Sequence, residues 1–139
     1  MYKFNIEFGD ISNDGHGMTK VFSLECSVSK EELESLYDKA KENTGFNFAE
    51  ELCDEYGVNY INISYLQDLK KLKNIDILSI AEKDFDYKED GCFVFGPEAF
   101  LYLFLDFINQ YSGKNFTYKV NSQINDRWSI YMGYGLFSY

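Results

Sequence analysis

One polar loop, residues 10–17, contains the residues of this sequence that could bind a small ligand. Asp10, Ser12 and Asp14 alternate along it and a glycine follows, as in the first half of an EF-hand calcium loop, where alternate residues supply oxygen ligands. A full EF-hand is excluded, because its twelfth position needs a bidentate glutamate and the residue here is Val21. We favour a turn whose Asn and Asp side chains bond to their own backbone, and we keep a weaker oxygen-ligand site as the alternative.

Histidine-dependent catalysis has a single candidate residue, since His16 in this loop is the only histidine of the chain. No G-x-S-x-G nucleophile elbow accompanies it, and its two glycine neighbours leave little to fix its tautomer. His16 and the three cysteines match a zinc ligand count, but the paired Cys and His spacings of zinc sites are missing. We therefore assign no catalytic residue, no metal ligand set and no cofactor to this chain from its His and Cys residues.

The cysteines are odd in number and widely spaced, at Cys26, Cys53 and Cys92. This pattern favours reduced thiols over a disulfide framework. The N-terminus lacks the cationic and apolar segments of a secretory signal. We therefore expect a cytoplasmic protein.

The most informative carboxylate is Asp106, because it lies inside an otherwise apolar helix. A narrow polar stripe at helical spacing contains it, formed by Glu98, Tyr102, Asp106 and then Asn109 or Gln110. Either this stripe touches solvent, which we favour, or Asp106 is buried and must be paired. A buried pair would make Asp106 a candidate functional group, as in a carboxylate-dependent enzyme.

The helix that contains Asp106 is the element around which we expect the chain to fold. Gly96-Pro97 provides a helix start and Ser112-Gly113 a stop. Its apolar residues leave almost no polar face: Phe100, Leu101, Leu103, Phe104, Leu105, Phe107 and Ile108. Such a helix is buried, and its apolar run is too short for a membrane span of about 20 residues. We predict a central core helix at about 97–111.

Alternation of apolar and polar residues predicts the strands, at residues 2–8, 19–28, 116–120 and 128–134. We expect the first two to pair as an antiparallel hairpin, and we expect a polar loop over 121–127. Asp90-Gly91 predicts a second, tight hairpin between 85–87 and 92–95.

Capping signals predict three further helices. The first has a capping box formed by Ser29 and Glu32. The second, which is shorter, begins at Asn47 with Glu50 at its third position, and the third begins at a capping box that starts with Ser64. The apolar stripe of the third helix is Leu66, Leu69 and Leu72. Residues 74–81 fit a buried strand as well as a short helix. The chain as a whole, 1–139, is predicted to form one α+β domain, with a mainly antiparallel sheet and three to four helices.

The net charge of −10 is concentrated in residues 31–90, which contain sixteen acids and seven lysines. Nucleic acids and anionic membranes are disfavoured as partners, because both are bound through clustered Lys and Arg. A basic protein partner is compatible with this charge, because opposite fields steer association. The acids that we expect on exposed helix faces, where they could bind such a partner, are Glu31, Glu34, Asp38, Glu51, Asp54 and Glu55.

The end of the chain is unusually aromatic, with Tyr131, Tyr134, Phe137 and Tyr139. Tyrosines are enriched where proteins bind proteins. We expect a last strand that closes the sheet, and its outer face could also contact a partner.

These features favour a small cytoplasmic protein-binding module without catalysis, whose partner is another protein, with basic partners favoured. Within that class we expect an inhibitor, such as a toxin-immunity protein, an antitoxin or a phage anti-defence protein. The alternative is a domain that binds a small ligand or divalent metal through the Asp10–Gly17 loop, and a carboxylate-dependent enzyme is third. Oligomeric state and partner identity are not predicted.

Overall fold

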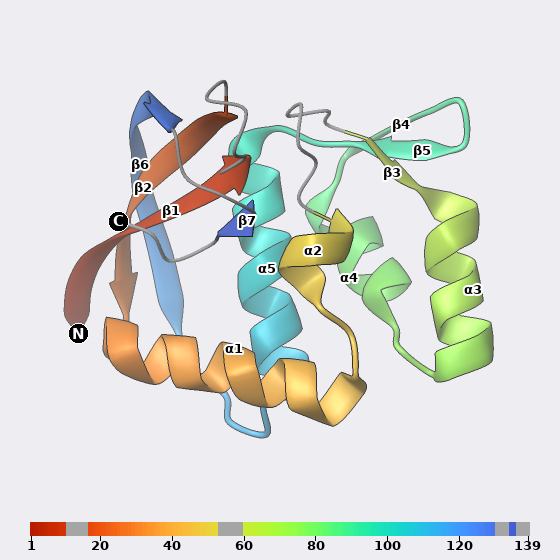
Figure 1. Ribbon diagram of the computed structural model, residues 1–139, viewed down its shortest axis with the longest axis horizontal. Helices are drawn as coiled ribbons and strands as arrows, with labels where there is room; N and C mark the ends of the chain where they lie inside the picture. The colour runs from red at the N-terminus through yellow and green to blue at the C-terminus, as the bar shows by residue number, and fades with distance from the viewer. Residues whose placement is uncertain (11–16, 53–59, 130–133, 136–139) are drawn as a thin grey trace.

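The computed structural model of the chain describes residues 1–10, 17–52, 60–129 and 134–135, with the backbone alone described at 7–10, 17–20, 97, 122–129 and 134–135. It confirms the predicted α+β class (Figure 1). The helices are α1 (Lys30–Thr44), α2 (Phe48–Leu52), α3 (Ile63–Lys73), α4 (Ile77–Asp84) and α5 (Pro97–Tyr111).

The described strands form two antiparallel sheets. The larger sheet has the order β6-β2-β1-β7. Its strands are β1 (Tyr2–Asp10), β2 (Gly17–Cys26), β6 (Tyr118–Ser129) and β7 (Tyr134–Gly135). The smaller sheet has the order β3-β5-β4. Its strands are β3 (Tyr60–Asn62), β4 (Tyr87–Glu89) and β5 (Cys92–Val94).

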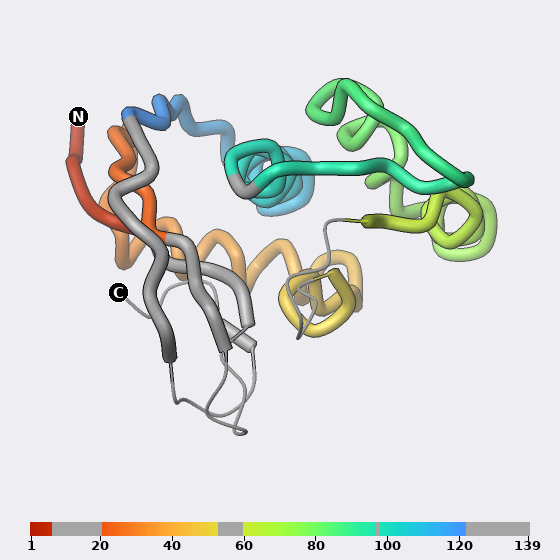
Figure 2. Tube along the Cα trace, turned by 90° about the horizontal axis from the view of Figure 1, so that it is seen from above, coloured from red at the N-terminus to blue at the C-terminus, as the bar shows by residue number. Residues whose placement is uncertain are grey.

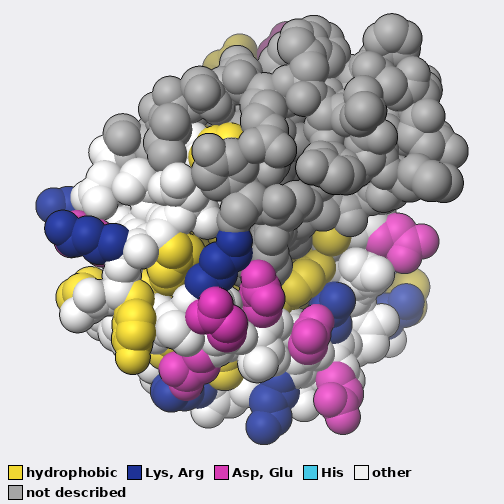
Figure 3. Space-filling view, turned by 60° about the vertical axis from the view of Figure 1, so that its left-hand side comes forward, with side chains coloured by type: hydrophobic (Ala, Val, Ile, Leu, Met, Phe, Trp, Pro, Cys, Tyr) yellow, Lys and Arg dark blue, Asp and Glu magenta, His cyan; other side chains and the backbone are white. Residues whose placement is uncertain are grey.

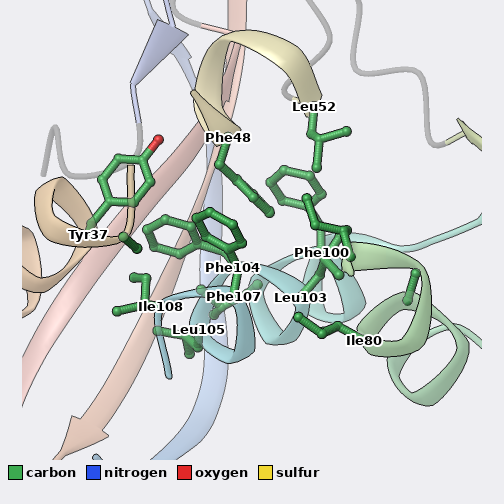
Figure 4. Close-up of a cluster of buried hydrophobic side chains, with 14 of the residues drawn as sticks. Tyr37, Phe48, Leu52, Ile80, Phe100, Leu103, Phe104, Leu105, Phe107 and Ile108 are labelled. Carbon is green, nitrogen blue, oxygen red and sulfur yellow. The ribbon is translucent and has the colours of Figure 1, made fainter. Parts of the chain in front are cut away.

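Helix α5 lies in the middle of the molecule, as its apolar sequence predicts. The large sheet, the pair α1 and α2, and α4 lie around it (Figures 1 and 2). All seven of its predicted apolar residues are buried. Phe48 of α2 packs against three rings of α5, with centroid distances of 5.6, 5.5 and 5.1 Å to Phe100, Phe104 and Phe107 (Figure 4).

Helix α1 begins and ends where its capping signals predict. The Ser29 side chain accepts a hydrogen bond from Glu32 N (3.1 Å), and Gly45 ends the helix in the left-handed conformation (φ 68°). Its buried residues are Leu33, Leu36, Tyr37 and Ala40. The Tyr37 hydroxyl accepts a hydrogen bond from Ala49 N (3.0 Å), and this bond ties α1 to α2.

The predicted start of α3 at Ser64 is wrong, because Asn62 caps the helix instead. Its side chain accepts a hydrogen bond from Tyr65 N (3.1 Å), and asparagine caps helices as well as serine does. Burial then ends at Leu69, and Leu72 in the last turn is 76% exposed. The apolar stripe predicted for this helix therefore extends one residue beyond its buried part.

The ambiguous segment 74–81 contributes to a fifth helix, α4. Asp76 caps it by accepting a hydrogen bond from Ser79 N (3.1 Å). Asn74 in the left-handed conformation (φ 56°) separates it from α3. Capping residues rather than periodicity fix this element. The described residues therefore contain five helices, one more than the upper end of the three to four that we expected.

The tight hairpin at Asp90-Gly91 is confirmed. Both turn residues have positive φ, 50° and 76°, as a type I′ turn requires. The strands pair from Glu89 opposite Cys92 to Tyr87 opposite Val94.

The predicted polar loop over 121–127 is wrong, because β6 continues through it. This strand pairs with β2 from Cys26 opposite Tyr118 to Gly17 opposite Ser129, with two register shifts. It forms one edge of the large sheet. A polar sequence is compatible with an edge strand, since the backbone makes the ladder and one side meets water.

None of the helices in the described ranges is long and apolar enough to cross a membrane.

Two leucines of α3 allow a matched test of the core. We expect Leu66→Ala to lower the free energy of unfolding by about 2–5 kcal/mol, because Leu66 is fully buried. Leu72→Ala, the same chemical change six residues later, should change it by less than about 0.5 kcal/mol. Urea denaturation followed by circular dichroism measures both values, and equal losses would contradict this packing of α3.

Candidate functional site

A polar cluster lies where α4, α5 and β6 meet, and Asp106 is at its centre. Its Oδ1 accepts a hydrogen bond from the Tyr118 hydroxyl (2.8 Å), and its Oδ2 lies 3.6 Å from Lys83 Nζ. Only 16% of the Asp106 side chain is exposed. Asp106 therefore lies between the two alternatives: its neighbours cover most of it and it is paired, but part of its side chain still meets solvent. The polar stripe reaches solvent at its start, where exposed Glu98 accepts a hydrogen bond from the Tyr102 hydroxyl (3.1 Å).

The second carboxyl of the cluster belongs to Asp84, the last residue of α4. Burial raises the pKa of Asp84 to about 7, and the hydrogen bond and negative charge of Asp106 act in the same direction, while Lys83 opposes them. Asp84 Oδ2 is buried and has no hydrogen-bond partner among the described residues. Near neutral pH Asp84 is therefore partly protonated, because burial and the neighbouring carboxylate make its negative charge unfavourable.

Two tyrosines complete the cluster. Burial raises the pKa of Tyr118, and the hydrogen bond to Asp106 raises it further. Burial and the hydrogen bond to Glu98 likewise raise the pKa of Tyr102. The two rings lie 5.9 Å apart between centroids. Both phenols therefore stay protonated and act as hydrogen-bond donors to carboxylates.

A groove of about 580 Å³ opens beside this cluster, between α4 and the C-terminal half of α5. Its lining residues are Ser79, Ile80, Lys83, Asp106, Asn109, Gln110, Asn115 and Phe116. The hydroxyl of Ser79 donates to Asp76 Oδ2 (2.8 Å), so it is engaged in the cap of α4. The amide of Asn109 bonds to both the N–H and the C=O of Phe116 (2.8 and 3.2 Å).

The lining of this groove therefore suits structure better than catalysis. Its serine hydroxyl is bonded to the Asp76 side chain, and its Asn109 amide holds the backbone of Phe116. Its carboxylate is bound by Tyr118 and Lys83. A general base must instead reach the proton that it removes. We conclude that the hydrogen bond from Tyr118 and the ion pair with Lys83 let Asp106 hold α5 against β6 and α4.

The predicted acids of α1 share one face of the helix. Glu31 and Asp38 are exposed, and Glu34 is half-buried. With exposed Glu42 they recur at helical spacing, opposite the buried stripe. Lys41 pairs with Asp38 (3.3 Å), and no cation of the described residues pairs with the other three. Figure 3 shows acids and lysines interspersed over the described part of one face of the molecule.

The predicted acids of the second helix are only partly described. Glu51 is exposed, and its Oε2 accepts a hydrogen bond from the Tyr65 hydroxyl (3.1 Å). Burial raises the pKa of Tyr65 to about 12, with Glu51 acting in the same direction. Asp54 and Glu55 lie outside the described residues. A joint acidic surface of α1 and α2 stays a prediction.

The predicted ligand loop and aromatic terminus fall mostly outside the described residues. Asp10 ends β1 and pairs with Tyr134 of β7. The other predicted residues of these two sites, which the structure does not describe, are Ser12, Asp14, His16, Tyr131, Phe137 and Tyr139. Both sites stay predictions.

The sequence pattern misses most of the polar cluster. Tyr118 lies on a predicted strand, but its partner Asp106 is distant in sequence and was expected in solvent. Asp84 follows a segment whose type periodicity could not decide. A capping signal at Asp76 was available, and it would have predicted α4 and so placed Asp84 at its end.

Comparisons of the chain with protein-family models, with curated proteins and with solved structures find no significant match. Within the part of the chain that the structure describes, no three His, Cys, Asp or Glu side chains are grouped so that they could hold a metal ion.

The raised pKa of Asp84 predicts how this residue changes stability with pH. Its folded pKa of about 7 lies above the ordinary value of 3.8, so its stabilising effect is present in acid and is lost as pH rises through 7. Asp84→Asn should therefore stabilise the protein relative to wild type by about 1–2 kcal/mol at pH 8, and by less at pH 5. Urea denaturation across this pH range measures the difference. Glu82→Gln, at an exposed acid of the same helix, is the control, and parallel wild-type and Asp84→Asn curves would contradict the prediction.

The Tyr118 hydroxyl allows a second test of the cluster. Tyr118→Phe should lower the free energy of unfolding by about 1.5–3 kcal/mol, because it removes a hydrogen bond to a mostly buried carboxylate. Tyr102→Phe is the matched control, since its hydroxyl bonds to the exposed Glu98, and it should cost less than about 1 kcal/mol. Chemical denaturation distinguishes the two variants, and a Tyr118→Phe loss no larger than the Tyr102→Phe loss would overturn this account.

Proposed function

We propose that this chain is a non-catalytic protein-binding module that inhibits a basic protein, with the outer face of α1 as its contact surface. The observation that supports the proposal is the run of Glu31, Glu34, Asp38 and Glu42 along the side of the helix opposite its buried residues. An inhibitor of this kind needs no catalytic group.

The anchoring of α1 suits such a contact. The helix is fixed at its start by the Ser29 cap, and Lys114 pairs with Glu32 beside that cap. At its end the Asn43 amide donates to Tyr111 O of α5 (2.8 Å). A rigid helix presents its acids in one fixed arrangement, so little conformational freedom is lost on binding.

Charge gives this surface its selectivity for a partner. Three of the four acids, Glu31, Glu34 and Glu42, form no ion pair with a lysine among the described residues, so a partner can supply Lys or Arg without first breaking an ion pair. Complementary charges raise the association rate most at low ionic strength. We therefore expect binding that weakens with salt.

A charge-neutralised variant tests the contact surface. The variant carries Glu31→Gln, Glu34→Gln and Glu42→Gln and is immobilised on a column. At low salt it should bind a basic partner at least about tenfold more weakly than the wild type, because three of the four negative charges of the surface are removed. Capture from lysate of the source cell, followed by quantitative mass spectrometry, measures retention.

A control with the same change in charge is Glu50→Gln, Asp68→Asn and Glu82→Gln, at exposed acids outside α1. It should retain the partner as the wild type does. If both variants lost the partner equally, net charge rather than the α1 surface would explain binding, and the proposal would fail. If the wild-type column retained no partner at low or at physiological salt, the proposal would also be overturned.

A further inference from the structure

The small sheet has one buried face and one open face. Ile61 and Phe93 are buried on the inner face. On the open face Tyr60 and Tyr87 are 50% and 58% exposed, and both lie opposite the half-buried Val94 of the central strand. Directly opposed residues of antiparallel strands share a face, so these three side chains form one row across the sheet. An apolar and aromatic row of this kind is typical of a protein-binding surface.

Strand β4 is an edge of this sheet, as Figure 1 shows. The Ile63 N–H donates to Gly91 O (2.9 Å), so Gly91 and Phe93 direct their backbone groups toward β3. The backbone groups of Cys92 and Val94 then bond to β4. The β4 residue that lies opposite Phe93 makes no backbone bond to β5, so its N–H and C=O point away from the sheet. That residue is Lys88. Its N–H and C=O are therefore placed to accept another strand.

The charges beside this edge favour a basic strand. Asp86, Glu89 and Asp90 are all exposed, and Glu89 shares the open face with Tyr87. The one lysine of the strand, Lys88, points to the inner face, where its Nζ lies 5.1 Å from the centre of the Phe93 ring. An incoming side chain beside Tyr87 and Glu89 therefore meets an aromatic ring and a carboxylate, which together suit Lys or Arg.

The same charges disfavour a second copy of this chain at the edge. Antiparallel pairing of two β4 strands about Lys88 would place Lys88 opposite Lys88 and Asp86 opposite Asp90. Like charges directly opposite each other destabilise a strand pair. Charged side chains on a short edge strand also prevent unselective pairing between sheets.

We propose that β4 binds an extended segment of a protein partner that carries Lys or Arg at alternate positions, by adding it as a fourth strand to the small sheet. The partner's backbone bonds to Lys88, and its basic side chains lie over Tyr87 and Glu89 on the open face. This mode, strand addition, takes affinity from backbone hydrogen bonds and selectivity from alternate side chains. The surface is separate from the acidic face of α1 (Figures 1 and 2), so the two proposals can fail independently.

The test uses the full chain and three synthetic peptides. The probe alternates lysine with threonine, the second peptide has glutamate for lysine, and the third is the lysine peptide with alternate backbone amides methylated. We expect the lysine peptide to bind with at least about tenfold higher affinity than either of the others, because each lacks one of the two interactions. NMR titration measures binding, and hydrogen exchange of the Lys88 amide should slow at least about tenfold in the complex.

Variants of the protein separate this surface from net charge. Tyr87→Ala and Glu89→Lys should each lower the affinity for the lysine peptide by at least about tenfold. Tyr87→Phe and the control Glu82→Lys should leave this affinity unchanged.

If the lysine peptide instead lost binding only in the α1 variant (Glu31→Gln, Glu34→Gln and Glu42→Gln), with NMR chemical-shift changes confined to α1, that result would overturn this inference and support the α1 proposal. Equal binding of the methylated peptide, no saturable binding at low ionic strength, or a dimer of the chain that Glu89→Lys abolishes would also overturn it.

Discussion

A helix with apolar side chains around most of its circumference must be largely enclosed, and α5 imposes this requirement on the elements around it. Leu101 and Leu105 are inaccessible to solvent, as are their neighbours Leu103 and Phe107. The large sheet, the α1 and α2 pair, and α4 each cover a different side. Each of these covering elements needs only one apolar face, so its outer face is available for charge. The acidic exterior of the protein and its apolar centre are therefore two consequences of one arrangement.

The polar cluster occupies a seam between two of these covering elements. Asp106 lies where α4 and β6 approach each other over α5, and a groove opens to water beside it. Apolar side chains alone would leave this seam either empty or exposed. Tyr118 of β6 and Lys83 of α4 instead bond to Asp106 of α5, and these two contacts join the three elements.

Sequence reasoning predicts those features whose causes are local. The Ser29 cap and the Asp90-Gly91 turn are each fixed by a few neighbouring residues, and both are confirmed. The continuation of β6 through 121–127 was missed because its pairing with β2 joins opposite ends of the chain, and no local alternation reports it. The partial burial of Asp106 was missed for the same reason. Its exposure depends on the packing of α4 and β6, which no helical period encodes.

The order of the elements along the chain also constrains how the protein is made. Strand β2 pairs with β6, and α1 packs against α5, so the N-terminal hairpin and α1 find their partners only after most of the chain has left the ribosome. Until then Phe22, Leu24 and Leu33 have no complete core to enter. The acidic segment 31–90 emerges during this interval, and its mutual repulsion opposes self-association of the unfinished chain. The acidic residues on the surface of the folded protein thus also limit aggregation of the nascent chain.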